Sequence, residues 1–271
     1  MPGTEHQTPE PFFDLQADGS LLPRPLGRSP WSADMMHGRL LAGLAARQLE
    51  SGLDPAFRCA RLTVDMFRFP PMKPVTVGTS VVRDGRRVKV FQVDLAIEGV
   101  AVARATALAY RHGTQPPGDV WSPPPWSVPP PESLPEAPPS PQPFPTEFRY
   151  PEGGGWGILG QKKVWARDRS KLVGDEQATP LVRAAMAADL ASPLSHSSDR
   201  GLAFINGDIT LYLARYPTDE WIGFEVTGHV SADGIAVGQC TLHDRAGVVG
   251  YSVATAVANE PMSPAGSGRE G

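Results

Sequence analysis

The sequence contains an internal repeat, and the repeat limits the chain to folds built from two copies of one unit. The block RLTVDMFRFPP at residues 61–71 resembles DITLYLARYPT at residues 208–218, and a long alternating segment follows each block. The matching positions are Arg68-Phe69-Pro70 and Arg215-Tyr216-Pro217, Asp84-Gly85 and Asp233-Gly234, and Gly99 and Gly247. Apolar and polar residues that alternate between such turns are typical of an antiparallel meander, so each half is predicted to form one.

A proline-rich segment separates the two halves. Proline recurs densely from residue 116 to residue 145, and proline cannot donate to a strand ladder and breaks helices. We therefore predict a linker at 116–145 between an N-terminal unit at 11–115 and a C-terminal unit at 146–260. The alternative, a ligand for an SH3-type module, fits poorly between two ordered halves. Residues 1–10 and 261–271 have the composition of disordered ends.

A helical segment precedes each block of strands. In residues 36–50 the leucines recur at helical spacing. In the second half, Thr179 is suited to cap a helix that begins at Pro180 and continues to Ser192. The many alanines of this second helix allow it to lie very close to a sheet.

One helix followed by a curved antiparallel sheet is the hotdog arrangement. We therefore predict an α+β fold, a tandem (double) hotdog in which each half is a helix wrapped by a curved antiparallel sheet. Two such units on one chain can pair edge to edge, and this pairing covers strand edges that would otherwise be exposed.

Composition and charge agree with a soluble protein. Of the 271 residues, 41% are hydrophobic and 20% charged, which is ordinary for a globular chain. The formal net charge of −4 creates no field that would attract nucleic acid or an anionic membrane. No apolar run reaches the roughly 18 residues of a membrane span, and the N-terminus lacks the apolar stretch of a signal peptide.

From these features we expect a cytoplasmic protein with no nucleic-acid or membrane partner. The two cysteines, Cys59 and Cys240, are expected to be buried free thiols in a reducing compartment, and the alternative is a disulfide between them. No cysteine or histidine cluster has metal-ligand spacing, so no metal is expected.

Taken in order, the motifs resemble the type II acyl-CoA thioesterase family of the thioesterase-like superfamily, whose members carry two hotdog units in tandem. The resemblance covers nearly all of residues 30–258 apart from the linker. The residues that carry it are His37-Gly38 at a helix start, Arg68 and Arg215 after a strand, Arg83-Asp84-Gly85-Arg86, Asp208, and Glu220-Trp221. Together these motifs are more specific for the fold than for the reaction.

The resemblance implies a set of residues that would hold the attacking water of thioester hydrolysis. In the family these are a carboxylate, a hydroxyl residue and a glutamine, all from the second unit. Asp208 matches the carboxylate, and an aspartate within a strand is disfavoured by propensity. The alternative for Asp208 is a solvated carboxylate on the outer face of the sheet.

The hydroxyl position is assigned by counting from its neighbours. It falls on Thr227 when counted back from Asp233-Gly234, and close to His229 when counted forward from Trp221. Both residues are therefore candidates for the catalytic set. Thr227 is alternatively an ordinary strand residue, and His229 is either a base near neutral pH or a surface histidine.

The glutamine position of the family falls on Ala254 in this sequence. Alanine has no group that orients water, and Thr255 points to the opposite face of its strand. Three alternatives follow: another side chain substitutes, the protein hydrolyses poorly, or it binds its ligand without turnover.

Two further places are predicted to contact the substrate. A helix N-terminus at His37 and Gly38 would polarise the thioester carbonyl through backbone N–H groups, and Gly38 allows close approach. His37 is alternatively a helix cap. Arg83 and Arg86 lie in a basic turn that would contact the phosphates of coenzyme A, unless they are ordinary charges of a hairpin.

The sequence thus predicts hydrolysis of acyl-CoA thioesters to free acid and coenzyme A, with no cofactor. The alternative is a non-catalytic double-hotdog protein that binds acyl-CoA or another lipid. A hotdog hydratase would need an Asn-Pro-Leu-His-type segment, from which residues 192–196 depart. Because double-hotdog proteins often associate further, self-association into a homo-oligomer is part of this hypothesis.

Overall fold

The computed structural model describes residues 10–137 and 145–262. It contains the helices α1 (Gly38–Glu50), α2 (Pro180–Ala188) and α3 (Ala191–His196), and the short 3-10 turns Pro25–Gly27 and Pro131–Ser133. The first repeat supplies the strands β1 (Phe13–Leu15), β2 (Leu21–Pro23), β3 (Phe57–Met66), β4 (Val75–Asp84), β5 (Val88–Ile97) and β6 (Val100–Arg111). The second supplies β7 (Thr146–Arg149), β8 (Lys163–Asp168), β9 (Ser197–Ser198), β10 (Gly201–Asn206), β11 (Asp208–Leu213), β12 (Ile222–Ala232), β13 (Ile235–Asp244) and β14 (Gly247–Met262).

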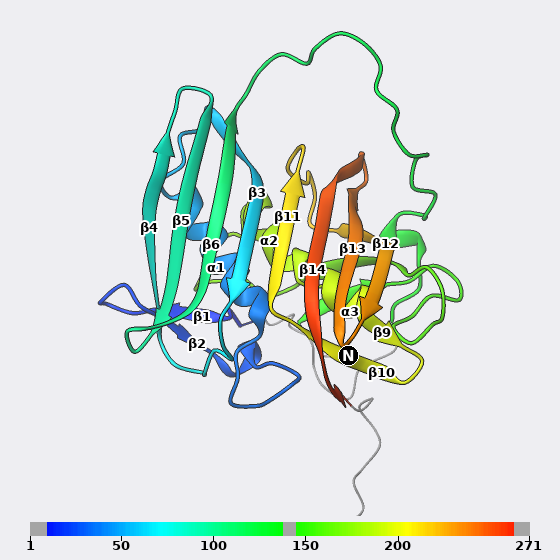
Figure 1. Ribbon diagram of the computed structural model, residues 1–271, viewed down its shortest axis with the longest axis horizontal. Helices are drawn as coiled ribbons and strands as arrows, with labels where there is room; N and C mark the ends of the chain where they lie inside the picture. Colours follow the sequence, from blue (N-terminus) through cyan, green and yellow to red (C-terminus); the bar gives the residue numbers. More distant parts are fainter. Residues whose placement is uncertain (1–9, 138–144, 263–271) are drawn as a thin grey trace, which may run out of the picture.

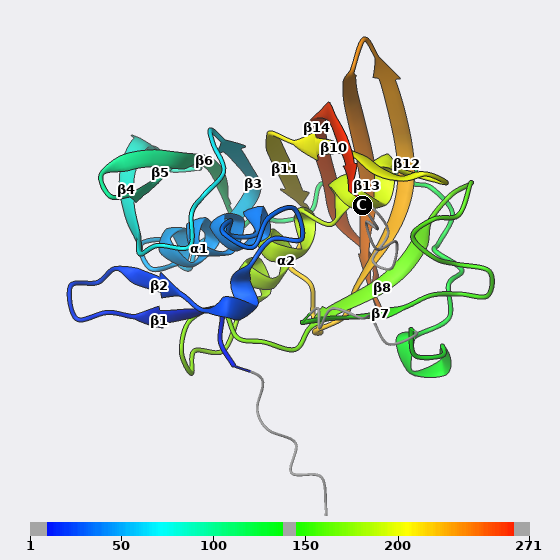
Figure 2. The same ribbon diagram turned by 90° about the horizontal axis from the view of Figure 1, so that it is seen from below.

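The two repeats join into one antiparallel sheet (Figure 1). Its order is β1-β2-β4-β5-β6-β3 from the first unit and β11-β14-β13-β12-β8-β7 from the second, while β10 pairs with β14 and with β9. The sheet curves so that α1 and α2 lie on its inner side, between the long strands and the edge hairpins (Figure 2). The predicted α+β double hotdog is therefore confirmed.

The seam between the repeats is the antiparallel pair β3 and β11. Its register sets Arg61 opposite Tyr212 and Asp208 opposite Asp65, with Thr63 opposite Thr210 at the centre. Thr63 and Thr210 are the third residues of the two repeated blocks, and the Thr210 hydroxyl donates to the Thr63 hydroxyl at 3.2 Å. The two units are therefore related by an approximate twofold axis that passes between these threonines.

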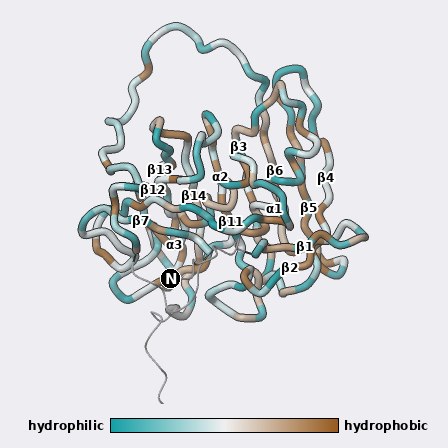
Figure 3. Tube along the Cα trace, turned by 180° about the vertical axis from the view of Figure 1, so that it is seen from behind, coloured by the Kyte–Doolittle hydropathy of each residue, from teal (hydrophilic) through white to brown (hydrophobic). Residues whose placement is uncertain are grey.

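Hydrophobic and hydrophilic residues alternate along the strands (Figure 3), and because successive side chains of a strand point to opposite faces, the sheet has an inner and an outer face. In β5, Phe91, Val93, Leu95 and Ile97 are buried and the residues between them are partly exposed. The inner face packs on the helices, and this burial of apolar surface is the main stabilising contribution to the fold.

The helices begin where the sequence predicts. His37 caps α1, and the Thr179 hydroxyl accepts from the backbone N–H of Val182 at the start of α2. The two helices approach closely, because a Cβ atom on Gly43 would lie 2.7 Å from Cγ of Met186. The predicted second helix is interrupted: α2 ends at Ala188, and α3 begins at Ala191.

A buried arginine ties the two units together beneath the sheet. Arg39, only 1% exposed, lies in the first turn of α1. Its Nη1 donates to Oδ1 of Asp168 at 2.6 Å and to the Thr146 hydroxyl at 2.9 Å, and the guanidinium lies 5.1 Å from the ring centre of Phe12. A group from the first unit is thus held by β7 and β8 of the second.

The chain after β6 arches over one end of the sheet before it reaches the second unit (Figure 1). Trp126 anchors it there: its ring packs on Trp165 and stacks on His243 at 4.3 Å between ring centres. Residues 138–144 of the predicted linker, and nearly all of the predicted disordered ends, lie outside the described residues. The predicted domain boundaries therefore stay predictions.

Two other sequence expectations concern the described residues. Cys59 and Cys240 are free and buried, as predicted. None of the helices in the described part of the chain is long and apolar enough to cross a membrane.

Replacement of Arg39 by methionine should destabilise the fold strongly. The variant leaves Asp168 in a partly buried position without its cation, and breaking a buried pair in this way costs about 3 kcal/mol. The matched control is Arg104→Met, because Arg104 and Asp94 form an ion pair with side chains 47% and 46% exposed, and such pairs contribute at most about 1 kcal/mol. Urea unfolding of both variants measures the difference, and equal losses would contradict a structural role for Arg39.

Candidate active site

A buried carboxylate lies where the N-terminus of α1 meets the C-terminus of α2. Asp189 follows α2 directly and is 6% exposed. Its Oδ1 accepts from Nδ2 of Asn206 at 2.8 Å, and its Oδ2 lies 3.5 Å from Nδ1 of His37. A Cβ atom on Gly38 would lie 3.7 Å from the same Oδ2. Three elements, α1, α2 and the end of β10, therefore converge on one acidic group.

Burial shifts the pKa values of Asp189 and of its neighbour His37. Burial raises the pKa of Asp189, although hydrogen bonds from Asn206 and the backbone N–H of Arg39 and the charge of Arg39 oppose the rise. Burial, with a smaller effect from the charge of Arg39, lowers the pKa of His37 to about 3. His37 is therefore neutral near pH 7, and its Nδ1 accepts from the N–H of Arg39 at 3.4 Å as the helix cap.

The structure places Asp208 elsewhere, at the first position of β11. Its Oδ1 accepts from the backbone N–H of Thr255 at 2.9 Å and from the Thr255 hydroxyl. Thr255 is exposed, whereas its neighbour Ala254 is fully buried. Asp208 therefore shares the outer face of the sheet with Thr255, and Ala254 lies on the inner face.

Thr227 and His229 are not beside Asp208, because β14 and β13 lie between β11 and β12. The register of β12 against β13 shifts between Val226 and Gly228, so Thr227 is the extra residue of a bulge and is exposed. The bulge turns His229 toward α3, where its Nδ1 lies 3.1 Å from Nδ1 of His196. The predicted catalytic residues thus do not form one cluster.

The predicted substrate-binding residues divide between two ends of the sheet. His37 and Gly38 belong to the Asp189 site, at the Met66 end of β3, where a Cβ atom on Gly38 would lie 2.7 Å from Sδ of Met66. Arg83 and Arg86 are exposed at the β4–β5 hairpin, which the register places near Phe57, at the other end of β3. The structure therefore does not bring the two arginines to the Asp189 site.

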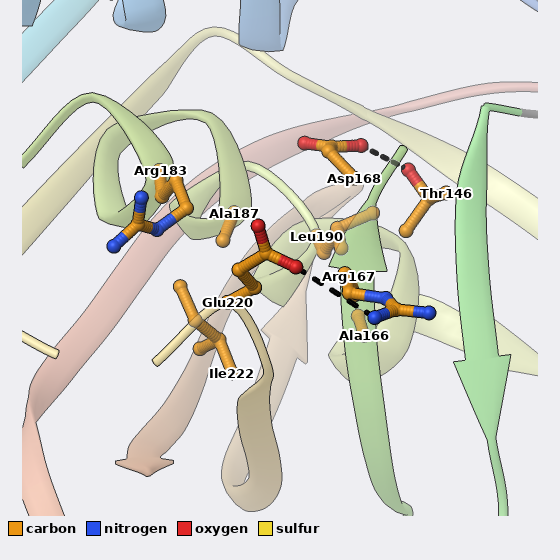
Figure 4. Close-up of a pocket in the computed structure, with 9 residues that line it drawn as sticks. All are labelled: Thr146, Ala166, Arg167, Asp168, Arg183, Ala187, Leu190, Glu220 and Ile222. Carbon is orange, nitrogen blue, oxygen red and sulfur yellow. Dashed lines mark hydrogen bonds and ion pairs between the residues drawn. The ribbon is translucent and has the colours of Figure 1, made fainter. Parts of the chain in front are cut away.

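Two hollows flank the helices. A small one, shown in Figure 4, lies between α2 and β8 and holds about 20 Å³, which suits one water molecule. The ion pair of Arg167 with Glu220 (3.6 Å) and the bond from the Thr146 hydroxyl to Asp168 (2.6 Å) lie along it. A larger groove of about 370 Å³ lies between the end of α1 and the start of α2, where the Thr179 hydroxyl donates to Glu50.

The reading of the sequence missed Asp189 and Asn206. The available signal was one acidic residue inside MAADLAS, a run of small and apolar residues. Burying a charge in such a run is unfavourable, so an acidic residue there points to a function. Asn206 stands two residues before Asp208, in the segment to which the sequence already assigns a candidate carboxylate.

Fold and site together define the class: a double-hotdog protein with a buried acid at a helix N-terminus. Two family models match the sequence, an acyl-CoA thioesterase N-terminal domain over residues 27–110 and an acyl-CoA thioesterase C-terminal domain over residues 122–258. The chain therefore belongs to the acyl-CoA thioesterase family. A search of curated proteins returned no match.

Solved structures with the same fold include several thioesterases. A thioesterase II of Thermobifida fusca is 18% identical with a TM-score of 0.69, over 89% of this chain and 91% of that chain. Acyl-CoA thioesterase II of Mycobacterium marinum is 20% identical with a TM-score of 0.62, over 82% and 90%. A hotdog protein of Alicyclobacillus acidocaldarius is 16% identical with a TM-score of 0.66, over 90% and 92%. At these identities the likeness concerns the fold.

The lowered pKa of His37 predicts a pH dependence of stability. Below about pH 6.5 the unfolded chain takes up a proton at this residue, while the folded protein stays neutral there down to about 3. The free energy of unfolding should therefore fall by up to about 1.4 kcal/mol per pH unit across this window. His37→Asn keeps a capping group and does not titrate, so its stability should fall less steeply with acid. Urea unfolding between pH 3 and 7 measures this, and parallel curves would contradict it.

Proposed function

We propose that this protein hydrolyses acyl-CoA thioesters to a free acid and coenzyme A, with Asp189 as the carboxylate that holds the attacking water. The observation that carries the proposal is the buried Asp189 between Asn206 and the N-terminus of α1. Family membership supports the substrate class.

The geometry suits the two requirements of the reaction. A carboxylate whose pKa is raised by burial is, in its ionised form, a stronger base toward water than an exposed carboxylate, and Asn206 fixes its orientation. The positive end of the α1 dipole, beside Gly38, favours the negative charge that develops on the thioester oxygen. Gly38 has no side chain and the Met66 side chain packs into the space beside it, so approach of the carbonyl to the helix backbone there requires Met66 to move aside.

The roles predicted for Asp208, Thr227 and His229 stay predictions. Asp208 is the alternative to Asp189 as the carboxylate that holds the water. Replacing each of the two by asparagine distinguishes between them. Arg83 and Arg86 stay candidates for phosphate contacts at their own end of the sheet. Assembly of the chain into a homo-oligomer also stays a prediction.

The second candidate function is binding of acyl-CoA without turnover. Ala254 favours it, because the glutamine position of the family carries no polar group here. The two functions differ in whether free thiol is released, so one assay distinguishes them.

Release of free coenzyme A from a panel of short to long acyl-CoAs tests the proposal. Asp189→Asn preserves shape but cannot accept the proton, so kcat should fall by about 10²-fold or more. The matched control, Asp208→Asn, keeps an oxygen that accepts from the N–H of Thr255 and should leave kcat largely unchanged.

A loss of kcat in Asp208→Asn alone would instead assign the attacking water to Asp208. Saturable acyl-CoA binding with no thiol release by the wild type would favour the binding function.

A further inference from the structure

A pair of histidines outside the Asp189 site connects the interior with solvent. His196, the last residue of α3, is 4% exposed, and its Nε2 has no hydrogen-bond partner among the described residues. Its Nδ1 lies 3.1 Å from Nδ1 of His229, which is exposed and whose Nε2 lies 3.2 Å from the Ser231 hydroxyl. Only one of two facing Nδ1 atoms can be the donor, so the rings share one proton.

Three features of the sequence build this pair. The bulge at Thr227 reverses which residues of β12 face inward, and so it turns His229 onto α3. Gly238, opposite His229, leaves the space that Ser195 and His196 fill, because a Cβ atom there would lie 2.7 Å from Cβ of Ser195 and 2.8 Å from Cε1 of His196. Phe204 packs against both rings, with centres 5.7 and 6.2 Å away.

The pair lies beside the position where the family glutamine is missing. Ala254 pairs with Gly238 across the sheet, and its backbone favours the protonated His196 ring, an effect on the pKa that burial outweighs. On the same inner face of β14, the Ser252 hydroxyl donates to the carbonyl of Ala188, next to Asp189. Further along β14, Ala256 pairs with Asn206. The inner face at Ala254 is therefore bordered by the Asp189 site on one side and by His196 on the other.

We propose that His196 supplies the polar group that Ala254 lacks, as a second base for the attacking water, and that His229 carries the proton from His196 to solvent. This role rests on the proposed hydrolase function. In this relay, Nε2 of His196, which has no hydrogen-bond partner among the described residues, is the atom assigned to the water, and His229 is a positioning residue that acts through His196.

The proton transfers balance without any further reactant. The water oxygen attacks the thioester carbonyl, and its proton moves to the lone pair on Nε2 of His196. Nδ1–H of His196 then passes to Nδ1 of His229, which releases its Nε2–H to solvent. When the C–S bond breaks, the electron pair leaves with sulfur, and the thiolate takes a proton from solvent to give free coenzyme A.

The charges around the pair keep His196 neutral and therefore able to accept. Burial, and then the neighbouring His229, lower the pKa of His196 to about 4. The cation on this end of α3 is Lys162, whose Nζ donates to the carbonyl of Ser197 at 2.9 Å. The groups that β10, β13 and β14 present to the ring, Phe204, Gly238 and Ala254, are uncharged.

Chemical rescue tests the relay. His229→Ala removes the proton carrier at an exposed position, so thiol release from acyl-CoA should fall at least about tenfold, and added imidazole should restore it by acting as the carrier. His196→Asn should lose about 10²-fold in kcat with little change in KM, and imidazole should not restore it because the site is buried. His112→Ala, at an exposed histidine outside the site, controls for effects of imidazole itself.

Each outcome either supports or overturns the proton relay. Full activity in His229→Ala, or a loss that imidazole does not restore, overturns the relay while the hydrolase stands on the wild-type turnover. If His196→Asn fails to fold, as circular dichroism would show, the rescue of His229→Ala alone decides. No turnover by the wild type overturns the hydrolase, and the relay with it.

Discussion

The antiparallel pair β3–β11 is the interaction on which the rest of the structure depends. Because equivalent strands of the two repeats pair with Thr63 opposite Thr210, the units are related by a twofold axis at the centre of the sheet. That symmetry makes α1 and α2 antiparallel on the inner face, so the N-terminus of each helix meets the C-terminus of the other. The positive end of a helix dipole and an acidic residue are therefore brought together twice, at Asp189 and at Glu50.

The two helix ends have since become different. At one end, Asp189 is buried beside the partly exposed Asn206 and His37, and burial raises its pKa. At the other end, Glu50 accepts a hydrogen bond from the Thr179 hydroxyl beside an open groove, and Arg47 forms a bidentate ion pair with Glu176. Taking the Asp189 carboxylate out of water has a desolvation cost, which its raised pKa reflects. The Asp189 end therefore retains an arrangement that folding alone does not favour.

Most of the fold could be predicted from the sequence, because the repeat, the proline-rich segment and the helix caps are local patterns. The site could be predicted only in part. His37 and Gly38 were predicted from their place at a helix start. The interruption of the second helix after Ala188 could not be predicted, because no turn residue marks it in the sequence. The bulge at Thr227 shifts the facing of every later residue in β12, and counting along a strand cannot detect one extra residue.

The same bulge shows how residues from separate elements come together on the inner face of the sheet. Side chains on the inner face of a sheet come from alternate residues of several strands and from the helices that cover them. A residue of α3 can therefore place a polar group beside Ala254, and Gly238 on the neighbouring strand leaves the space that Ser195 and His196 fill. The buried Nε2 of His196 without a bonded partner is unfavourable for stability by itself. The attacking water of the proposed relay would complete it.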